Sequence, residues 1–163
     1  MNNILKAAAF AAQAHGNQKR KYTGDPYITH CFEVAQTVQA VGGTCEQIVA
    51  AILHDTVEDT DVTIGEIEKN FGMVVATYVE WLTDCEGSMG NRATRKEIDR
   101  ERLAQAPAEV QTIKLADLLS NTKSIVERDP KFAVLYLSEK RELLKVLTKG
   151  DAQLHKRASE YCA

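Results

Sequence analysis

The segment Ile48-Val-Ala-Ala-Ile-Leu-His-Asp-Thr-Val-Glu-Asp-Thr60 decides the fold, because it joins a helical apolar pattern to four ionisable side chains. Ile48, Ile52 and Leu53 fall on one side of a helix, and this spacing predicts a helix over about 45–57. His54 and Asp55 directly follow the apolar residues. The segment therefore predicts a helix that carries polar, chemically active side chains near its end.

The chain on both sides of this segment is also predicted to be helical. Residues 16–26 contain two glycines, a proline and three consecutive basic residues, so they are predicted to form a charged loop. No run alternates apolar and polar residues for long enough to predict a strand. The predicted helices span 3–15, 27–41, 45–57, 63–70 (opened by a Thr63-x-x-Glu66 capping box), 72–84, 93–105, 108–127 and 131–148, with a short one in the tail. We predict an all-α, compact helical bundle that forms one domain over residues 1–163.

Composition restricts the classes of function. The net charge of −3 argues against a general nucleic-acid binder, although a local cluster of Lys and Arg can still hold a small phosphorylated ligand. The four cysteines have no Cys-x-x-Cys spacing, so they are interpreted as reduced thiols of a cytoplasmic protein. No segment has the length of a membrane span or the form of a signal peptide. The oligomeric state cannot be read from the sequence.

His30, His54, Asp55 and Asp117 are the candidate metal ligands. Two imidazoles and two carboxylates make a mixed nitrogen and oxygen set that suits Mn²⁺, Fe²⁺ or Zn²⁺. They lie on three predicted helices, which is how a helical bundle builds a metal site in its core. Taken singly, His30 has an ordinary explanation as a hydrogen-bonded surface residue, and Asp117 can simply pair with Lys114. Their joint occurrence is what predicts a metal site.

Glu58 and Asp59 are the candidate catalytic residues, because a metal with nearby acids is suited to activating a water molecule. Each lies four residues after a candidate ligand, so a helix that continued through Glu58 would place these side chains on one face. A kink at Thr56-Val57 would change that arrangement. The alternative is that Glu58 and Asp59 form a solvated acidic turn.

Other polar residues have two interpretations each. Lys19, Arg20 and Lys21 can clamp phosphate groups or form a solvated loop. The cluster Arg92, Arg95 and Lys96 is interpreted as a helix surface paired with Glu97 and Glu101, in preference to a phosphate site. Residues 86–95 form either a mobile lid or a simple connector. His15 is expected to bond the last carbonyls of the first helix.

Three longer motifs narrow the prediction. They are Gln18-Lys-Arg-Lys-Tyr-Thr-Gly-Asp-Pro-Tyr-Ile-Thr-His30, Ala51-Ile-Leu-His-Asp-Thr-Val-Glu-Asp-Thr60 and Ile113-Lys-Leu-Ala-Asp-Leu-Leu-Ser-Asn-Thr122. Together, over roughly residues 5–145, they resemble the HD-domain superfamily of metal-dependent phosphohydrolases, and within it the hydrolase domain of the RelA/SpoT family. The match is to a stand-alone small alarmone hydrolase.

This resemblance assigns a role to each candidate. It implies that the four ligands bind Mn²⁺, that Glu58 and Asp59 activate the attacking water, and that Arg20 or Lys21 contacts the nucleotide. Asn121, four residues after Asp117 on the same predicted helix, matches an asparagine near the ribose. The expected reaction removes the 3′-pyrophosphate from ppGpp or pppGpp to give GDP or GTP and pyrophosphate.

The departures from the family pattern leave the substrate base open. The family often has His-Pro where this chain has His30-Cys31, and its long members carry Arg-Leu-His-Asn-Met where this chain has Leu118-Leu-Ser-Asn-Thr122. An adenosine alarmone such as pppApp is therefore also considered. The alternatives are an HD-type nucleotidase acting on nucleoside monophosphates and an inactive nucleotide-binding sensor. The Glu58-Asp59-Thr60 element and the basic loop favour the alarmone, and the complete set of ligands and acids argues against a sensor.

Overall fold

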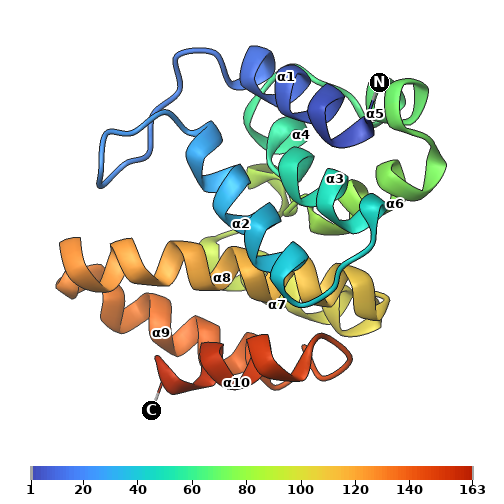
Figure 1. The fold of residues 1–163 in the computed structure, drawn as a ribbon. Coiled ribbons are helices and arrows are strands. Elements are labelled where there is room, and N and C mark those ends of the chain that lie inside the picture. Colours follow the sequence, from blue (N-terminus) through green and yellow to red (C-terminus); the bar gives the residue numbers. More distant parts are fainter. Residues whose placement is uncertain (1, 163) are drawn as a thin grey trace. The chain divides into compact units, whose positions relative to one another are not determined.

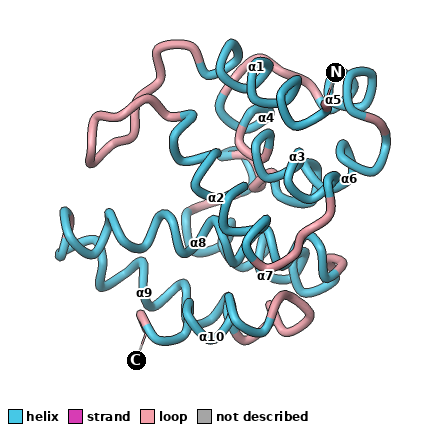
Figure 2. The backbone as a smooth tube through the Cα atoms, viewed as in Figure 1, coloured by secondary structure: helices cyan, strands magenta, loops and turns pink. Residues whose placement is uncertain are grey.

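A computed structural model describes residues 2–162, and it confirms the all-α prediction. Among these residues the sheet-like pairing is limited to an isolated bridge between Lys19 and Pro26, and Figure 2 shows helices joined by loops. The helices are α1 (Asn3–His15), α2 (Ile28–Ala40), α3 (Cys45–Leu53), α4 (Thr56–Asp59), α5 (Ile64–Phe71), α6 (Met73–Leu82), the 3₁₀-helix η1 (Gly87–Met89), α7 (Arg92–Gln105), α8 (Ala108–Arg128), α9 (Pro130–Leu144) and α10 (Ala152–Glu160).

Local signals fix most of the helix boundaries. The Thr63 hydroxyl and the Glu66 carboxylate form the predicted reciprocal capping box at the start of α5. The helix predicted over 45–57 is interrupted, because α3 ends at Leu53 and the separate short helix α4 follows. This difference arises next to His54 and Asp55, the residues that the sequence assigns to a metal site.

The contacts of the chain gather in two units, of which the first extends to Thr83. In the first unit α3 is the central helix, since it packs against α1, α2 and α6 (Figure 1). Every residue from Gln47 to Leu53 is buried, as expected for a helix that is covered all round. Gly43 allows the tight connection from α2 to α3, because a Cβ atom there would lie 2.5 Å from Cγ1 of Val38.

The second unit begins at Asp84 and is built around α8, which packs against α9 and α10. The buried Gln111 side chain ties α8 to the neighbouring segments, because its amide donates to the carbonyl of Leu103 and accepts from the backbone N–H of Lys149. None of the helices in residues 2–162 is long and apolar enough to cross a membrane. A single domain for the whole chain stays a prediction.

Candidate functional site

Three of the four candidate ligands come together in the first unit. His30 lies in the first turn of α2, His54 caps the end of α3, and Asp55 begins α4. Oδ2 of Asp55 lies 3.0 Å from Nε2 of His54 and 3.5 Å from Nε2 of His30. The two imidazole rings are themselves 5.2 Å apart between centroids. Two ring nitrogens and one carboxylate oxygen thus converge on one small volume.

The break between α3 and α4 is what makes this convergence possible. The Thr56 hydroxyl donates to the Leu53 carbonyl at 2.7 Å, and the Asp59 N–H donates to the Asp55 carbonyl at 2.9 Å, so a new helical turn begins at Asp55. The break therefore falls before the Thr56-Val57 position considered from the sequence. Because of it, adjacent residues in the chain, His54 and Asp55, bring their side chains to the same point.

The hydrogen bonds of His54 suit this set of donor atoms to a divalent metal. Nδ1 of His54 lies 2.8 Å from the Ala51 carbonyl, and a carbonyl oxygen only accepts, so Nδ1 carries the proton. In the neutral ring Nε2 is then a lone-pair donor, and it faces the Asp55 carboxylate. Two electron-rich atoms at 3.0 Å are stabilised by a positive charge beside them. A backbone carbonyl that orients a histidine in this way is common in protein metal sites.

Tyr27 belongs to this cluster and was not assigned to it from the sequence. Its hydroxyl donates to Oδ2 of Asp55 at 2.6 Å, and its ring lies 5.5 Å from that of His30. The one sequence signal is that Tyr27 precedes His30 by three residues at the start of α2, a spacing that places two side chains on one helix face.

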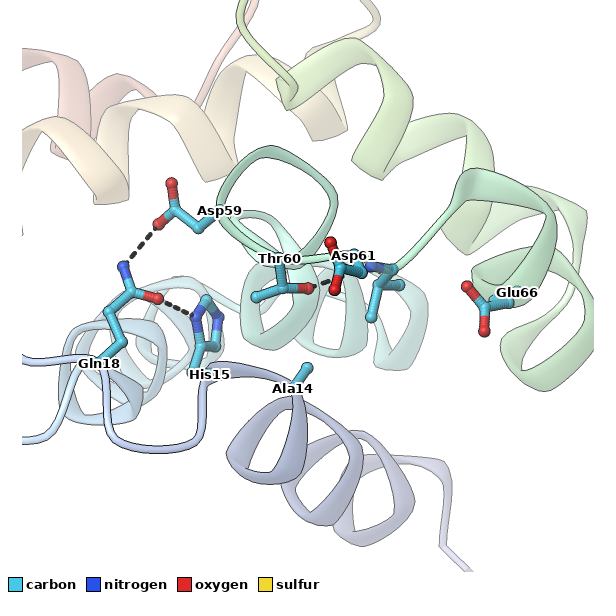
Figure 3. Close-up of a pocket in the computed structure, with 8 residues that line it drawn as sticks. Ala14, His15, Gln18, Asp59, Thr60, Asp61 and Glu66 are labelled. Atoms are coloured by element: carbon cyan, nitrogen blue, oxygen red, sulfur yellow. Dashed lines mark hydrogen bonds between the residues drawn. The ribbon is translucent and has the colours of Figure 1, made fainter.

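Glu58 and Asp59 lie on α4, immediately after the cluster, and both are exposed. Oδ2 of Asp59 accepts a hydrogen bond of 3.0 Å from the Gln18 side-chain amide. A pocket of about 540 Å³ opens beside Asp59, between the end of α1 and the segment that leads into α5 (Figure 3). Solvent therefore reaches this acid from the pocket.

The fourth candidate ligand, Asp117, lies in the second unit on α8. Asn121 donates to its Oδ1 at 2.8 Å, as the four-residue spacing suggested, and Nζ of Lys114 lies 3.0 Å from its Oδ2. The pairing with Lys114 considered from the sequence is thus present. Lys114 also lies 3.9 Å from Asp84. Burial opposes the ionisation of Asp84, but the charges of Lys114 and Lys96 outweigh it and lower the pKa of this carboxyl.

The two basic residues predicted to contact substrate lie on the loop between α1 and α2. Arg20 pairs with Glu33 of α2 at 2.8 Å, whereas Nζ of Lys21 lies 4.9 Å from the centre of the Tyr22 ring. The backbone N–H of Arg20 donates to the Asp25 carbonyl, which closes the loop on itself. The loop therefore presents these residues from a folded hairpin-like segment.

Two expectations about other polar residues need correction. Arg92 and Lys96 do form surface ion pairs, but their partners are Glu139 and Asp84 and not the nearby Glu97 and Glu101. Tertiary packing supplies these partners, because α9 and the segment before η1 lie beside α7. His15 does not bond the last carbonyls of α1: its side chain is 5% exposed, and its Nδ1 meets Oε1 of Gln18 at 2.9 Å.

Comparison with known proteins gives three kinds of similarity. The model of the HD domain family matches residues 7–146. A guanosine-3′,5′-bis(diphosphate) 3′-pyrophosphohydrolase of Aquifex aeolicus is 44% identical over 125 residues, which are 75% of this chain and 18% of that protein. The guanosine-3′,5′-bis(diphosphate) 3′-pyrophosphohydrolase MESH1 of Homo sapiens is 39% identical over 125 residues, covering 75% of this chain and 69% of MESH1.

A solved structure shares the fold. It is described as a metazoan ortholog of SpoT that hydrolyses ppGpp and plays a role in starvation responses. It matches with a TM-score of 0.90 and 28% sequence identity, over 99% of this chain and 94% of that chain. The structural similarity thus extends over nearly the whole chain, beyond the segments that hold the candidate ligands.

Proposed function

The chain belongs to the HD-domain family, and we propose that it is a metal-dependent hydrolase of ppGpp and pppGpp. In this reaction the 3′-pyrophosphate is removed, and GDP or GTP and pyrophosphate are formed. The observation that carries the proposal is the convergence of His30, His54 and Asp55. It occurs in a chain that is 39% identical to human MESH1 over a segment that covers 69% of MESH1.

The metal site is proposed to consist of His30, His54, Asp55 and Asp117, with Mn²⁺ as the ion. Imidazole nitrogen together with carboxylate oxygen suits Mn²⁺, and the orientation of His54 by the Ala51 carbonyl leaves Nε2 available for coordination. When bound, such an ion supplies Lewis-acid activation of water and of a phosphoryl oxygen. Tyr27 holds Asp55 by donating to its Oδ2, so this ligand is fixed before any ion arrives.

Glu58 and Asp59 are proposed to act as the general base that accepts a proton from the attacking water. The water oxygen forms a bond to the phosphorus atom that carries the 3′-oxygen, and its proton passes to one of these carboxylates. The bond between phosphorus and the 3′-oxygen breaks, and the carboxylic acid passes its proton to the leaving oxygen, which becomes the 3′-hydroxyl. General-base assistance of this kind typically contributes about 10²–10⁴-fold to the rate.

Substrate binding is proposed to involve Arg20, Lys21 and Asn121. Arg20 and Lys21 lie on one loop and carry charges that can neutralise the phosphate groups. Asn121 is held by Asp117 and offers an amide next to a proposed ligand. The same site accepts pppApp if the base pocket tolerates adenine.

A cytoplasmic location is proposed because the four cysteines, Cys31, Cys45, Cys85 and Cys162, are all free thiols.

The test is product analysis by anion-exchange chromatography of the metal-stripped protein, with and without Mn²⁺. The substrates are ppGpp, pppGpp, pppApp and a set of nucleoside monophosphates. Asp55→Asn removes a ligand charge with little change of shape, and Glu68→Gln is the matched control on the exposed side of α5. We expect Mn²⁺-dependent pyrophosphate release that is lost in Asp55→Asn and unchanged in Glu68→Gln.

Other outcomes would overturn the proposed reaction or change its substrate. Release of inorganic phosphate from monophosphates alone would identify a nucleotidase. Stoichiometric metal binding without turnover of any alarmone would indicate a nucleotide-binding sensor. Faster turnover of pppApp than of ppGpp would keep the reaction and change the substrate.

A further inference from the structure

A line of hydrogen bonds runs from the end of α1 to Asp59 (Figure 3). Nε2 of Gln18 donates to Oδ2 of Asp59 at 3.0 Å, and Oε1 of Gln18 lies 2.9 Å from Nδ1 of His15. A carboxylate only accepts, so the amide end of Gln18 must face Asp59 and its carbonyl end must face His15. Nδ1 of His15 is therefore the donor to Gln18. His15 thus fixes the orientation of the Gln18 amide, and the Gln18 amide in turn binds Asp59.

His15, at the buried end of this chain of hydrogen bonds, is fixed by its contacts. His15 is 5% exposed, its ring lies 5.0 Å from that of Tyr27, and its Nε2 lies 3.8 Å from the thiol sulfur of Cys31. With its proton on Nδ1, the imidazole can accept the Cys31 S–H at Nε2. Both ring nitrogens then have partners, and the orientation of the imidazole is fixed.

The backbone around Gln18 is fixed as well. The chain turns at Gly16, whose φ of +50° lies in the left-handed region, and the Gln18 N–H then donates to the His15 carbonyl at 2.9 Å. The Gln18 carbonyl accepts from the N–H of Tyr27 at 2.8 Å. Gln18 is thus tied on one side to α1 and on the other to the residue that precedes α2.

Asp59, by contrast, lies on an exposed surface. It is the last residue of the short helix α4, and the pocket beside it admits water. An exposed carboxylate samples several rotamers unless a partner selects one. Gln18 provides such a partner from a rigid part of the fold.

We infer that Gln18, oriented by His15, is a positioning residue for the hydrolytic reaction, an inference that rests on the proposed function. Gln18 engages Oδ2 of Asp59 and so leaves Oδ1 to take the proton of the attacking water. His15 acts one step further away, because it keeps the Gln18 amide from rotating its oxygen toward the carboxylate. Neither residue touches the substrate in this scheme.

The test compares Gln18→Leu, which removes both ends of the bridge at similar size, with Gln13→Leu on the exposed face of α1. We expect Gln18→Leu to lower kcat about tenfold or more, as part of the general-base contribution, with KM and metal content unchanged and only a small decrease of Tm, because the buried His15 Nδ1 loses its acceptor. Gln13→Leu should leave all four quantities unchanged. A Gln18→Leu variant with normal kcat, or one that loses metal or Tm instead, would overturn the inference.

His15 offers a conservative rescue. An asparagine amide occupies nearly the position of the histidine Nδ1, so His15→Asn keeps the donor to Gln18, whereas the longer His15→Gln places its amide nearer Nε2. We expect His15→Asn to retain kcat within about threefold and His15→Gln to lose as much as Gln18→Leu. Equal activity of the two variants would contradict the orienting role.

A readout that needs no turnover separates this inference from the proposed function. The side-chain ¹⁵N–¹H signals of Gln18, identified by their absence in Gln18→Leu, should shift in Asp59→Ala, and they should shift less in His15→Asn, which keeps the donor, than in His15→Gln, although both variants lose the imidazole ring. Gln18 signals that are the same in the wild type and in Asp59→Ala would overturn the inference by themselves. Wild-type protein that hydrolyses no alarmone would overturn the proposed function and the catalytic purpose of the bridge, whatever the signals show.

Discussion

The hydroxyl of Tyr27 lies 2.6 Å from Oδ2 of Asp55, the same oxygen that faces Nε2 of His54 at 3.0 Å and Nε2 of His30 at 3.5 Å. One carboxylate oxygen is therefore contacted by a phenol and an imidazole from the start of α2 and by a second imidazole from the end of α3. The hydrogen bond from Tyr27 restrains the Asp55 carboxylate, so the fold already orders this proposed ligand.

The variant Tyr27→Phe removes this hydrogen bond and keeps the ring that packs on His15 and His30. We expect the affinity for Mn²⁺ to fall about 10-fold or more, because partners that orient a metal ligand typically contribute this much. Competition with a fluorescent chelator measures the change. Tyr22→Phe, a loop tyrosine in the same unit, is the control and should bind Mn²⁺ like the wild type. Equal affinities for the two variants would show that Tyr27 does not support the ligand.

Lys140 should make the stability of the protein depend on pH. Burial lowers the pKa of Lys140 from its usual 10.5 to about 8, and the ammonium group donates to the Thr122 hydroxyl. Below pH 8 this lysine is protonated in both the folded and the unfolded states, so the full cost of burying its charge is present. Above pH 8 the folded state releases the proton first, the unfolded state binds more protons, and the free energy of unfolding rises.

We therefore expect Lys140 to add about 2 kcal/mol to the free energy of unfolding between pH 8 and about pH 10. Urea unfolding of the wild type and Lys140→Met at several pH values isolates this contribution as the difference between the two curves. Burial raises the pKa of the neighbouring Tyr136, so its ionisation falls above this window. Lys156→Met, an exposed change on α10, should show the same dependence of the free energy of unfolding on pH as the wild type. A wild-type pH dependence in Lys140→Met would refute the expectation.

The cap of α3 should contribute to stability without entering the chemistry. The Thr44 hydroxyl accepts from the Gln47 N–H at 3.2 Å, and Oε1 of Gln47 accepts from the Thr44 N–H at 2.8 Å. Thr44→Ala is expected to lower the free energy of unfolding by about 1 kcal/mol, with normal kcat well below the unfolding temperature. Thr37→Ala, within α2, serves as the comparison in the same urea experiment. A large loss of kcat in Thr44→Ala would mean that this end of α3 affects the site at its other end.

Arg92 is expected to have no part in substrate binding. Its Nε and Nη2 atoms donate to the two carboxylate oxygens of Glu139 at 2.7 and 2.8 Å, so its charge is already matched by a fitted partner. Arg92→Met should leave KM for ppGpp within about twofold and change stability by less than about 1 kcal/mol, as is usual for a partly exposed pair. Arg20→Met should raise KM in the same assay. A raised KM in Arg92→Met would reassign the basic cluster to a phosphate site.

Short-range patterns were sufficient for the helices. The Thr63-x-x-Glu66 capping box and the apolar spacing of Ile48, Ile52 and Leu53 depend on neighbours within a turn or two. The helix opened by the capping box is present as α5, and the first part of the helix predicted over 45–57 is present as α3. The break at Asp55 was missed, because residues on both sides of it have acceptable helix propensity. There the bond from Thr56 to the Leu53 carbonyl and the packing around the His-Asp pair outweigh local preference.

The sequence by itself determined the all-α class and identified the histidines and carboxylates that are proposed as ligands, since both depend on residue identity and on spacing within single helices. The structure brings His30, His54 and Asp55 together in the first unit, and their binding of a metal stays a prediction. Only the tertiary structure decided that Tyr27 supports Asp55, that Gln18 bridges His15 and Asp59, and that Lys140 is buried. These relationships join residues whose separation in the chain carries no periodic signal, because side-chain packing between elements sets them and propensity does not.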